Sequence, residues 1–263
     1  FHSPIDILSP DEASALRTRL EGFEARDGKP LAGGMRDEAH LLFTWLNELV
    51  HHPRILDAVE DVLGPDLLCW SSTFFIKEAQ SPTFAAWHQD STYFGLEPYD
   101  QVTAWVALTD ASREAGCMEA LSAHGAPRQM DHRALRLENS INRAGQTITE
   151  PFDEKGAVTM QLDAGSFSLH HTLCVHRSAP NRATHRRIGC GINYIPAHVR
   201  STGPVRMAAM LVRGEDRWGH FDLYDPPTME FDTARHADVF QRYSENYRVQ
   251  VERHERQFAS ERV

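Results

Sequence analysis

Long apolar runs and paired cysteines are both missing from this sequence. No stretch of about 18 apolar residues could span a bilayer, and the first residues lack a basic and then apolar leader. The four cysteines, Cys69, Cys117, Cys174 and Cys190, form no CxxC pair, which argues against a disulfide framework and against a thiolate zinc site. We therefore expect a cytoplasmic protein that does not bind membranes.

Positive charge is also scarce. The chain has 27 Lys and Arg against 37 Asp and Glu, a formal net charge of −10. Nucleic acids and anionic membranes bind proteins through clusters of Lys and Arg, so we expect neither as a partner. The sequence has no internal repeat and no low-complexity segment, and it does not reveal the oligomeric state. The expected partner is a small-molecule substrate.

The composition is that of an ordinary globular protein, with 263 residues, 41% hydrophobic and 24% charged. Sandwiches and barrels often reach this length undivided, so we predict one domain over residues 1–263. Its predicted parts are N-terminal helices over 1–66, a core over 67–200 with a lid-like insertion at 122–156, and a C-terminal extension over 201–263.

Strand patterns dominate the predicted core. The expected strands are rich in β-branched and aromatic residues and cover 67–77, 101–108, 157–162, 166–175 and 188–195. Helices followed by short strands, without βα alternation, favour an antiparallel sandwich or barrel. After residue 195 the chain reads as loop until an amphipathic helix that contains Phe240, Tyr243 and Tyr247. The predicted fold class is mainly β with flanking α-helices.

His88 and Asp90 are spaced as two ligands of one metal. They lie two apart at the edge of a predicted strand, so both side chains leave the same face, while Trp87 and Gln89 point the other way. His176, at the end of another strand-like run, can supply the third ligand. Two histidines and one carboxylate leave three coordination positions open, as non-haem iron(II) oxygenases require, whereas zinc is more often four-coordinate.

Arg187 and Ser178 follow this third ligand. Arg187 begins another predicted strand, from which a guanidinium could reach the same cavity and bind a carboxylate bidentately. The Ser178 hydroxyl could share that carboxylate. The alternative is that Arg187 decorates a surface turn and that Ser178 only forms a turn.

The ordered set of motifs resembles the phytanoyl-CoA dioxygenase-like branch of the iron(II)/2-oxoglutarate oxygenases. It comprises Trp87-His88-Gln89-Asp90, Trp105 in TAWVALTD, Gly116-Cys117-Met118, HHTLCVHRSAPN over 170–181, and Arg187. The resemblance extends from the N-terminal helix to about residue 196. It implies a double-stranded β-helix, also called a jelly roll and cupin-like, whose core holds the metal.

The same resemblance implies roles for individual residues. It implies iron ligation by His88, Asp90 and His176, binding of the distal carboxylate of 2-oxoglutarate by Arg187 and Ser178, and a cosubstrate pocket lined by Trp105 and Thr73. The implied cofactors are Fe(II), 2-oxoglutarate and O2. Halogenating relatives replace the metal-binding carboxylate by a small residue, whereas Asp90 is present here, so hydroxylation is the expected reaction.

Four further residues are candidates for contact with the substrate: Tyr93, Phe94, Arg177 and Asn193. Relatives commonly have glycine at the position of Arg177, which places a cation near the metal rim. Tyr93 and Phe94 could equally wall the substrate or pack the strand end. We expect the substrate to be a small amine, amino acid or secondary metabolite whose unactivated C–H bond is hydroxylated.

Two other functions remain open from the sequence. One is a cupin-like metal enzyme with the same three ligands that does not use 2-oxoglutarate, and the other is a non-catalytic metal- or ligand-binding module on an inherited fold. A carboxylate clamp at Arg187 and Ser178 would separate the oxygenase from both, because neither alternative needs one. His170 and His171, which precede the third ligand, are expected to be structural or to support a metal ligand.

Overall fold

The computed structural model describes residues 1–122, 127–142 and 144–260. Parts of the predicted insertion at 122–156, and the last residues of the predicted C-terminal extension, therefore lie outside the described residues. None of the helices in the described ranges is long and apolar enough to cross a membrane.

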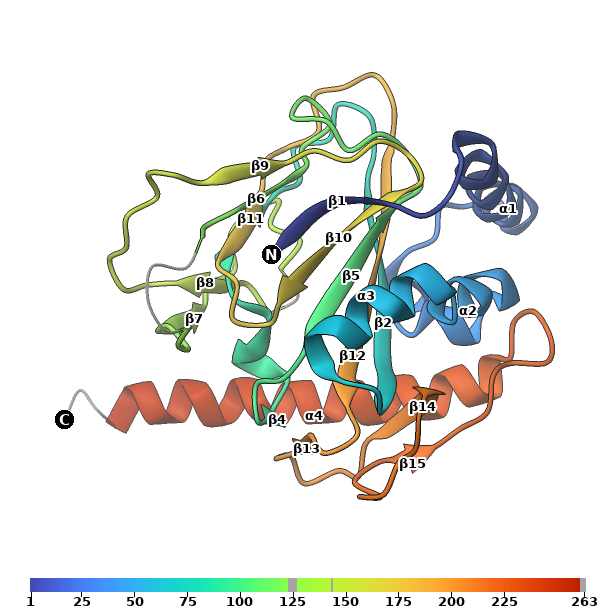
Figure 1. Ribbon diagram of the computed structural model, residues 1–263. Helices are drawn as coiled ribbons and strands as arrows, with labels where there is room; N and C mark the ends of the chain where they lie inside the picture. The colour runs from blue at the N-terminus through green and yellow to red at the C-terminus, as the bar shows by residue number, and fades with distance from the viewer. Residues whose placement is uncertain (123–126, 143, 261–263) are drawn as a thin grey trace.

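Two β-sheets form the centre of the molecule (Figure 1). The larger sheet has the order β1-β10-β5-β12-β2-β14-β15, with bounds His2–Asp6, Ser166–His171, Val102–Ala107, Arg187–Pro196, Leu67–Lys77, Ala208–Arg213 and Asp222–Leu223. The smaller sheet has the order β3-β11-β6-β9, with bounds Ala85–His88, His176–Ser178, Met118–Ala120 and Val158–Met160. Two small ribbons pair β13 with β4 and β7 with β8, with bounds Arg200–Ser201, Leu96–Glu97, His132–Ala134 and Gln146–Ile148.

A cavity lies between the two sheets, lined by residues of β2, β5, β10 and β12 from one and of β3, β6 and β11 from the other. The strands pair antiparallel throughout the centre, and only β14 and β15 among the described strand pairs are parallel. This arrangement confirms the predicted double-stranded β-helix with flanking helices.

Alternation along β2 and β12 separates the cavity from the apolar core. Phe74 and Ile188 face outward into the core, where they pack with Trp45 and Ile55 of the flanking helices. The alternate residues face the cavity instead. Most of the hydrophobic core therefore lies behind the larger sheet, and its inner face is left for the site.

Capping residues set both ends of the first helix. Ser9 caps α1 (Pro10–Asp27): its hydroxyl accepts a hydrogen bond from the Glu12 amide at 3.2 Å, and the Glu12 carboxylate accepts one from the Ser9 amide at 2.8 Å. Gly28, with a φ of +73°, ends the helix. The other N-terminal elements are α2 (Thr44–Val50), α3 (Pro53–Leu63) and the short helices η1 (Gly33–Arg36) and η2 (Ala39–Leu41).

The C-terminal region is more ordered than the sequence indicates. The predicted amphipathic helix is present as α4 (Thr233–Ser260), which runs along one end of the sheets (Figure 1). However, the prediction of a continuous loop before it was wrong, because β14 adds to the edge of β2 in the larger sheet. Strand β1 was also missed. Strands β1 and β14 pair with strands that are distant in the sequence, and a local pattern does not contain those partners.

The predicted strand over 166–175 is too long. Strand β10 ends at His171, where a turn closed by the Cys174 amide and the His171 carbonyl at 2.8 Å redirects the chain. The chain then enters the smaller sheet as β11, which begins at His176. The turn matters for the site because it carries His170 and His176 to opposite sheets of one cavity.

Candidate metal centre and its pocket

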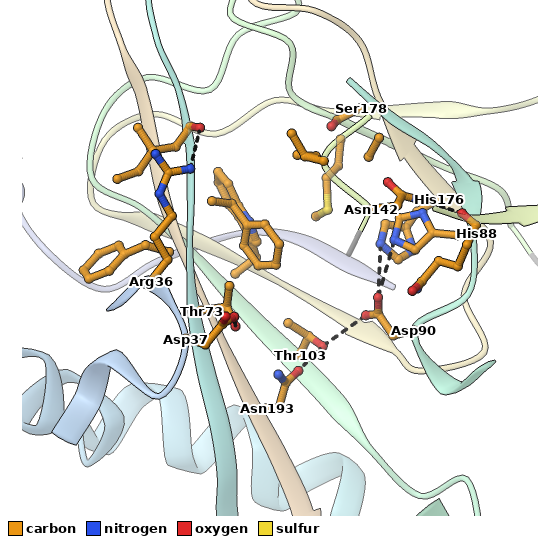
Figure 2. Close-up of a pocket in the computed structure, with 18 of the residues that line it drawn as sticks. Arg36, Asp37, Thr73, His88, Asp90, Thr103, Asn142, His176, Ser178 and Asn193 are labelled. Carbon is orange, nitrogen blue, oxygen red and sulfur yellow. Dashed lines mark hydrogen bonds and ion pairs between the residues drawn. The ribbon is translucent and has the colours of Figure 1, made fainter. Parts of the chain in front are cut away.

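The three predicted metal ligands converge at one end of the cavity (Figure 2). His88 ends β3, and His176 begins β11 directly opposite it in the antiparallel register. Nε2 of His88 and Nε2 of His176 lie 3.5 and 3.8 Å from Oδ1 of Asp90. Asp90 does not continue the strand as predicted, but begins the helical turn η3 (Asp90–Tyr93). The turn still directs its carboxylate towards both imidazoles.

Backbone carbonyls fix the tautomer of both histidines. Nδ1 of His88 lies 2.7 Å from the Ala86 carbonyl oxygen, and Nδ1 of His176 lies 3.0 Å from the Cys174 carbonyl oxygen. A carbonyl only accepts, so each Nδ1 must carry the proton and donate it. Each Nε2 is then left with a free lone pair that faces Asp90, which is the arrangement a metal-binding histidine needs.

The electrostatics of the cluster suit a divalent cation. Burial, and after it the adjacent His88, lower the pKa of His176 to about 3, so the imidazole is neutral near pH 7. Burial raises the pKa of the Asp90 carboxyl, but His176, His170 and His88 outweigh that effect and hold it well below its usual range. The candidate ligand atoms all lie within 4.8 Å of one another. A carboxylate and two neutral imidazoles fit iron(II).

Two neighbours hold the second oxygen of Asp90. Nε2 of His170 lies 3.4 Å from Oδ2, and the Thr103 hydroxyl lies 3.5 Å from the same atom. His170 thus supports a ligand, as expected from the sequence. His171 instead accepts a hydrogen bond from the Leu173 amide at 3.2 Å and belongs to the turn after β10.

Arg187 and Ser178 line the same cavity beyond the metal ligands. Next to both lies Lys77, which was not predicted from the sequence. Lys77 is fully buried, and its Nζ donates to the Ser178 hydroxyl at 2.8 Å. Lys77 and Arg187 are directly opposite in the β2–β12 register. The sequence does show that Lys77 is the only charged residue of its strand. Its role could not be predicted, because the sequence does not show that Arg187 lies opposite it.

These two basic groups are buried side by side. Burial, and after it the charge of Arg187, lower the pKa of Lys77 to about 6, while burial lowers the pKa of Arg187. Arg187 and Cys117 act on Lys77, and Cys117 acts on Arg187, with no carboxylate of the described chain among these groups. Nη1 of Arg187 donates to the Gly116 carbonyl at 2.5 Å, whereas its buried Nε has no partner. Such a pair is matched by an anion that enters from outside the chain.

Trp105 lies beside this cationic pair, with the Arg187 guanidinium carbon 5.4 Å from its ring centre. The indole occupies the space that a side chain at position 189 would fill, since a Cβ on Gly189 would lie 2.0 Å from Trp105 Cζ2. Gly191 also faces inward, where a Cβ would lie 2.8 Å from the Phe75 ring. The alternate glycines of β12 therefore make room for the ring and for the cavity.

The cavity has a volume of about 260 Å³ and extends from the metal ligands to a second, outer end. Asn193 lines it, with its Oδ1 accepting from Thr103 at 2.7 Å and its Nδ2 donating to Ser71 at 2.7 Å. Phe94 also lines it. Tyr93, in contrast, is buried against Tyr247 and His254 and is absent from the cavity wall.

Thr73 lines the cavity from the inner face of β2, and its hydroxyl donates to Oδ1 of Asp37 at 3.1 Å. Asp37, which follows η1, was not a candidate from the sequence. Figure 2 places Asp37 and Thr73 together across the cavity from the metal ligands. Tyr243 and Tyr247 of α4 also line the cavity.

Arg177 lies at the rim, with its charge compensated within the chain. Nε donates to Glu119 at 2.7 Å, Nη1 donates to Glu154 of the insertion at 3.2 Å, and the guanidinium stacks 4.5 Å above the Trp87 ring. Phe152 of the insertion packs edge-on against the same indole. Arg177 and Trp87 therefore hold the described part of the insertion onto the smaller sheet.

Comparison with known proteins agrees with the geometry. The family model described as phytanoyl-CoA dioxygenase (PhyH) matches residues 6–189. The chain belongs to the phytanoyl-CoA dioxygenase family. Membership confirms the predicted family and the predicted class, the 2-oxoglutarate-dependent non-haem iron oxygenases, whose HxD…H ligand set this chain carries.

Individual members of this family are distant in sequence. A probable alpha-ketoglutarate-dependent hypophosphite dioxygenase of Stutzerimonas stutzeri is 27% identical over 66% of this chain and 62% of its own length. Human peroxisomal phytanoyl-CoA dioxygenase is 27% identical over 49% of this chain and 40% of its own. The chain thus spans less than two thirds of either relative.

Solved structures cover the chain more fully. ThoJ, described as a non-haem monooxygenase, superposes with a TM-score of 0.82 at 33% identity, over 96% of this chain and 95% of its own. SnoK, a non-haem alpha-ketoglutarate-dependent carbocyclase from nogalamycin biosynthesis, gives a TM-score of 0.59 at 25% identity over 75% of this chain and 80% of its own.

Proposed function

We propose that this protein is an Fe(II)- and 2-oxoglutarate-dependent dioxygenase that hydroxylates an unactivated C–H bond of a small molecule. The observation that carries the proposal is the joint presence, in one cavity, of a His-Asp-His cluster and the buried guanidinium of Arg187, with Lys77 next to it. The first suits iron, and the second suits the distal carboxylate of 2-oxoglutarate.

In this proposal each residue has a distinct task. His88, Asp90 and His176 hold the metal, and Arg187 with Ser178 holds the distal carboxylate, to which Lys77 adds a second positive charge. The Ser178 hydroxyl accepts its hydrogen bond from Lys77, so its own proton remains available for a carboxylate oxygen. Trp105 covers the clamp and excludes water from it.

When bound together, iron(II), 2-oxoglutarate and O2 supply the oxidising chemistry: one oxygen atom enters succinate as CO2 leaves, and the other enters the substrate C–H bond as a hydroxyl. The residues of this chain orient the reactants. Asn193 and Thr103 belong to one hydrogen-bonded row that reaches Asp90, so they keep the ligand in place rather than reacting.

The cavity size restricts the substrate. At about 260 Å³ it is smaller than the roughly 300–1,000 Å³ of usual ligand pockets, and it must also admit 2-oxoglutarate. We therefore propose a small substrate such as an amine, an amino acid or the end group of a secondary metabolite, rather than a whole acyl-CoA thioester. A cytoplasmic location, with neither nucleic acid nor membrane as a partner, is part of the same proposal.

The deciding experiment is an anaerobic titration of the iron(II)-loaded protein with 2-oxoglutarate, monitoring the visible charge-transfer band of a chelated keto acid. We expect the band in the native protein, and we expect Arg187→Ala to need about 30-fold more 2-oxoglutarate, because a buried charge-assisted pair is worth 2 kcal/mol or more. Arg186→Ala is the matched control, since Arg186 binds Glu24 and Glu78 on the surface side. Absence of the band with iron bound would favour the cupin-like alternative.

A further inference from the structure

The residue between the first two metal ligands, Gln89, is buried and held largely by the insertion. Its side-chain Nε2 donates hydrogen bonds to the carbonyls of Arg128 at 2.9 Å and Leu173 at 2.6 Å. Its Oε1 accepts from the Met130 amide at 2.7 Å and from the Gln129 side chain at 3.3 Å. All four hydrogen-bonding positions of the side-chain amide are therefore used. Three of the four partners belong to the insertion.

The backbone of Gln89 is held by another residue of the insertion, His132. The Gln89 amide donates to Nε2 of His132 at 2.9 Å. A backbone amide only donates, so Nε2 must be unprotonated and Nδ1 must carry the proton, which points to the Met130 carbonyl at 2.8 Å. His132 is fully buried, and burial lowers its pKa to about 4, so the Nε2 lone pair stays available near pH 7. The Gln89 amide, just past the end of β3, thus takes its partner from a side chain of the insertion.

His132 is itself fixed from two sides. Its strand β7 pairs with β8, where His132 lies opposite Ile148. On the other side β7 lies against α4 (Figure 1). Nε2 of His254 in α4 donates to the His132 carbonyl at 2.8 Å, and the Glu255 carboxylate accepts from the Ala134 amide at 2.9 Å. The ring is therefore in place before any metal binds.

The insertion also holds the chain on the far side of Asp90. Asp90 leaves the sheet and begins η3, so strand pairing does not fix its direction. Gln129 of the insertion accepts a hydrogen bond from the Ser91 hydroxyl at 2.5 Å and donates one to the Thr92 hydroxyl at 3.0 Å. With Gln89 held on one side and Ser91 and Thr92 on the other, the insertion fixes the backbone that carries the Asp90 carboxylate.

We infer that His132 is a positioning residue, which holds the Gln89 amide and so keeps the Asp90 carboxylate directed at the metal. The insertion then belongs to the metal centre and does more than cover it. This inference rests on the proposed function and adds a residue to the same site. The coupling is reciprocal, so a bound metal must in turn stabilise the insertion by the same factor.

The first test measures the affinity for cobalt(II) in place of iron, and the visible d–d spectrum of the cobalt-loaded protein. His132→Leu removes the acceptor of the Gln89 amide. We expect this variant to bind cobalt(II) about tenfold more weakly and to change the d–d bands, because groups that support metal ligands are worth about 10- to 100-fold. His132→Gln supplies an amide oxygen as acceptor instead, so it should restore affinity to within about threefold of the native protein.

His40→Leu is the matched control. His40 is also fully buried, and its ring also has two side-chain partners, Ser72 at 2.8 Å and Tyr224 at 2.9 Å. These partners lie on β2 and directly after β15, away from Gln89. The variant should lower Tm as His132→Leu does, but it should keep the native cobalt(II) affinity and d–d spectrum. A purely structural role of His132 would not produce that difference.

The second test uses the native protein, so it does not depend on whether His132→Leu folds. Cobalt(II) should slow the amide hydrogen exchange of residues 130–134 by about tenfold relative to the metal-free protein, because the metal and the insertion stabilise each other. Amides of α1, which contributes no residue to the cavity wall, serve as the internal control and should exchange at the same rate in both states.

The inference is overturned if His132→Leu keeps the native cobalt(II) affinity and spectrum, or if His40→Leu impairs both equally. Should His132→Leu not fold, unchanged exchange of residues 130–134 on metal binding overturns it instead. The iron–2-oxoglutarate band of the native protein separates this failure from failure of the proposed function. If the band is present and these effects are absent, only the assignment of His132 is wrong. If the band is absent, the oxygenase proposal itself fails.

Discussion

The inner end of the cavity, at the candidate metal ligands, is built mainly from paired strands, whereas the rest of its wall is built from turns, an insertion and a helix. The inner end takes its ligands and its cationic pair from paired strands of the two sheets, and backbone carbonyls set the orientation of both histidines. The rest of the cavity wall comes from the turn after η1, from α4 and from the insertion, whose Asn142 lies beside the metal ligands (Figure 2). The comparison suggests that the sheet framework supplies the groups for the chemistry, whereas the segments added around it hold these groups in place and close the cavity.

The largest effect is expected when a candidate metal ligand is removed from the inner end. Asp90→Ala should lower iron(II) affinity by more than about 100-fold, since even the outer partners of metal ligands are worth about 10- to 100-fold. Equilibrium dialysis with iron(II), together with succinate formation, measures the effect. Thr103→Val, which removes the hydroxyl contacts to Asp90 at 3.5 Å and to Asn193 at 2.7 Å but leaves all three candidate ligands, should change affinity by less than about tenfold. Full iron affinity in Asp90→Ala would disprove the assignment.

The second test fills the space beside the clamp. Gly189→Ala should force the Trp105 indole to move, because the new Cβ would lie 2.0 Å from it. Overpacking costs about 1–3 kcal/mol, so we expect both a lower Tm and about 30-fold weaker 2-oxoglutarate binding. Gly22→Ala, at an open helical position, should leave binding unchanged. Unaltered cosubstrate affinity in Gly189→Ala would show that Trp105 does not limit the pocket.

A third test uses the pKa of Lys77, about 6 against the ordinary value of about 10.4. Between these values the unfolded chain holds a proton that the folded chain lacks, so the stability of the cosubstrate-free protein should rise as pH increases from about 6 towards 10. A bound carboxylate favours the charged amine, so 2-oxoglutarate binding should take up a proton and weaken by at most about tenfold per pH unit. Calorimetry in two buffers of different ionisation enthalpy measures this uptake, and equal uptake in Lys77→Met would contradict it.

The smallest expected effect lies at the rim of the cavity, at Arg177. Arg177→Ala removes the ion pairs to Glu119 and Glu154, which are partly exposed and worth about 1 kcal/mol or less, so Tm should barely change. The insertion should nevertheless be held less firmly, and the ratio of succinate formed to substrate hydroxylated should rise about two- to fivefold. Arg200→Ala, at an exposed ion pair with Glu97, should leave that ratio at the native value. An unchanged ratio in Arg177→Ala would separate the insertion from coupling.

The sequence predicts the inner end better than the outer one for a physical reason. His88, Asp90 and His176 lie in short local patterns, and β2 was predicted with its observed bounds, because alternation and ligand spacing are properties of a few neighbouring residues. Lys77 and Asp37 gain their meaning only from partners on other elements, Arg187 and Thr73. Strand β14 was missed for the same reason, since its partner β2 is distant in the sequence. A local sequence pattern does not show which distant residues come into contact in the folded protein.

Helix α4 lines the cavity but is synthesised last, after all the candidate metal ligands. The metal ligands and the cationic pair are complete once β12 has been synthesised, but Tyr243 and Tyr247 close the outer wall. The same helix holds the insertion, because Tyr247 donates to Gln146 at 2.6 Å and Glu255 accepts from the Ala134 amide at 2.9 Å. A nascent chain therefore has every group needed to bind a redox metal before it has the wall that shields it. Metal loading after release from the ribosome would spare the growing chain from self-oxidation.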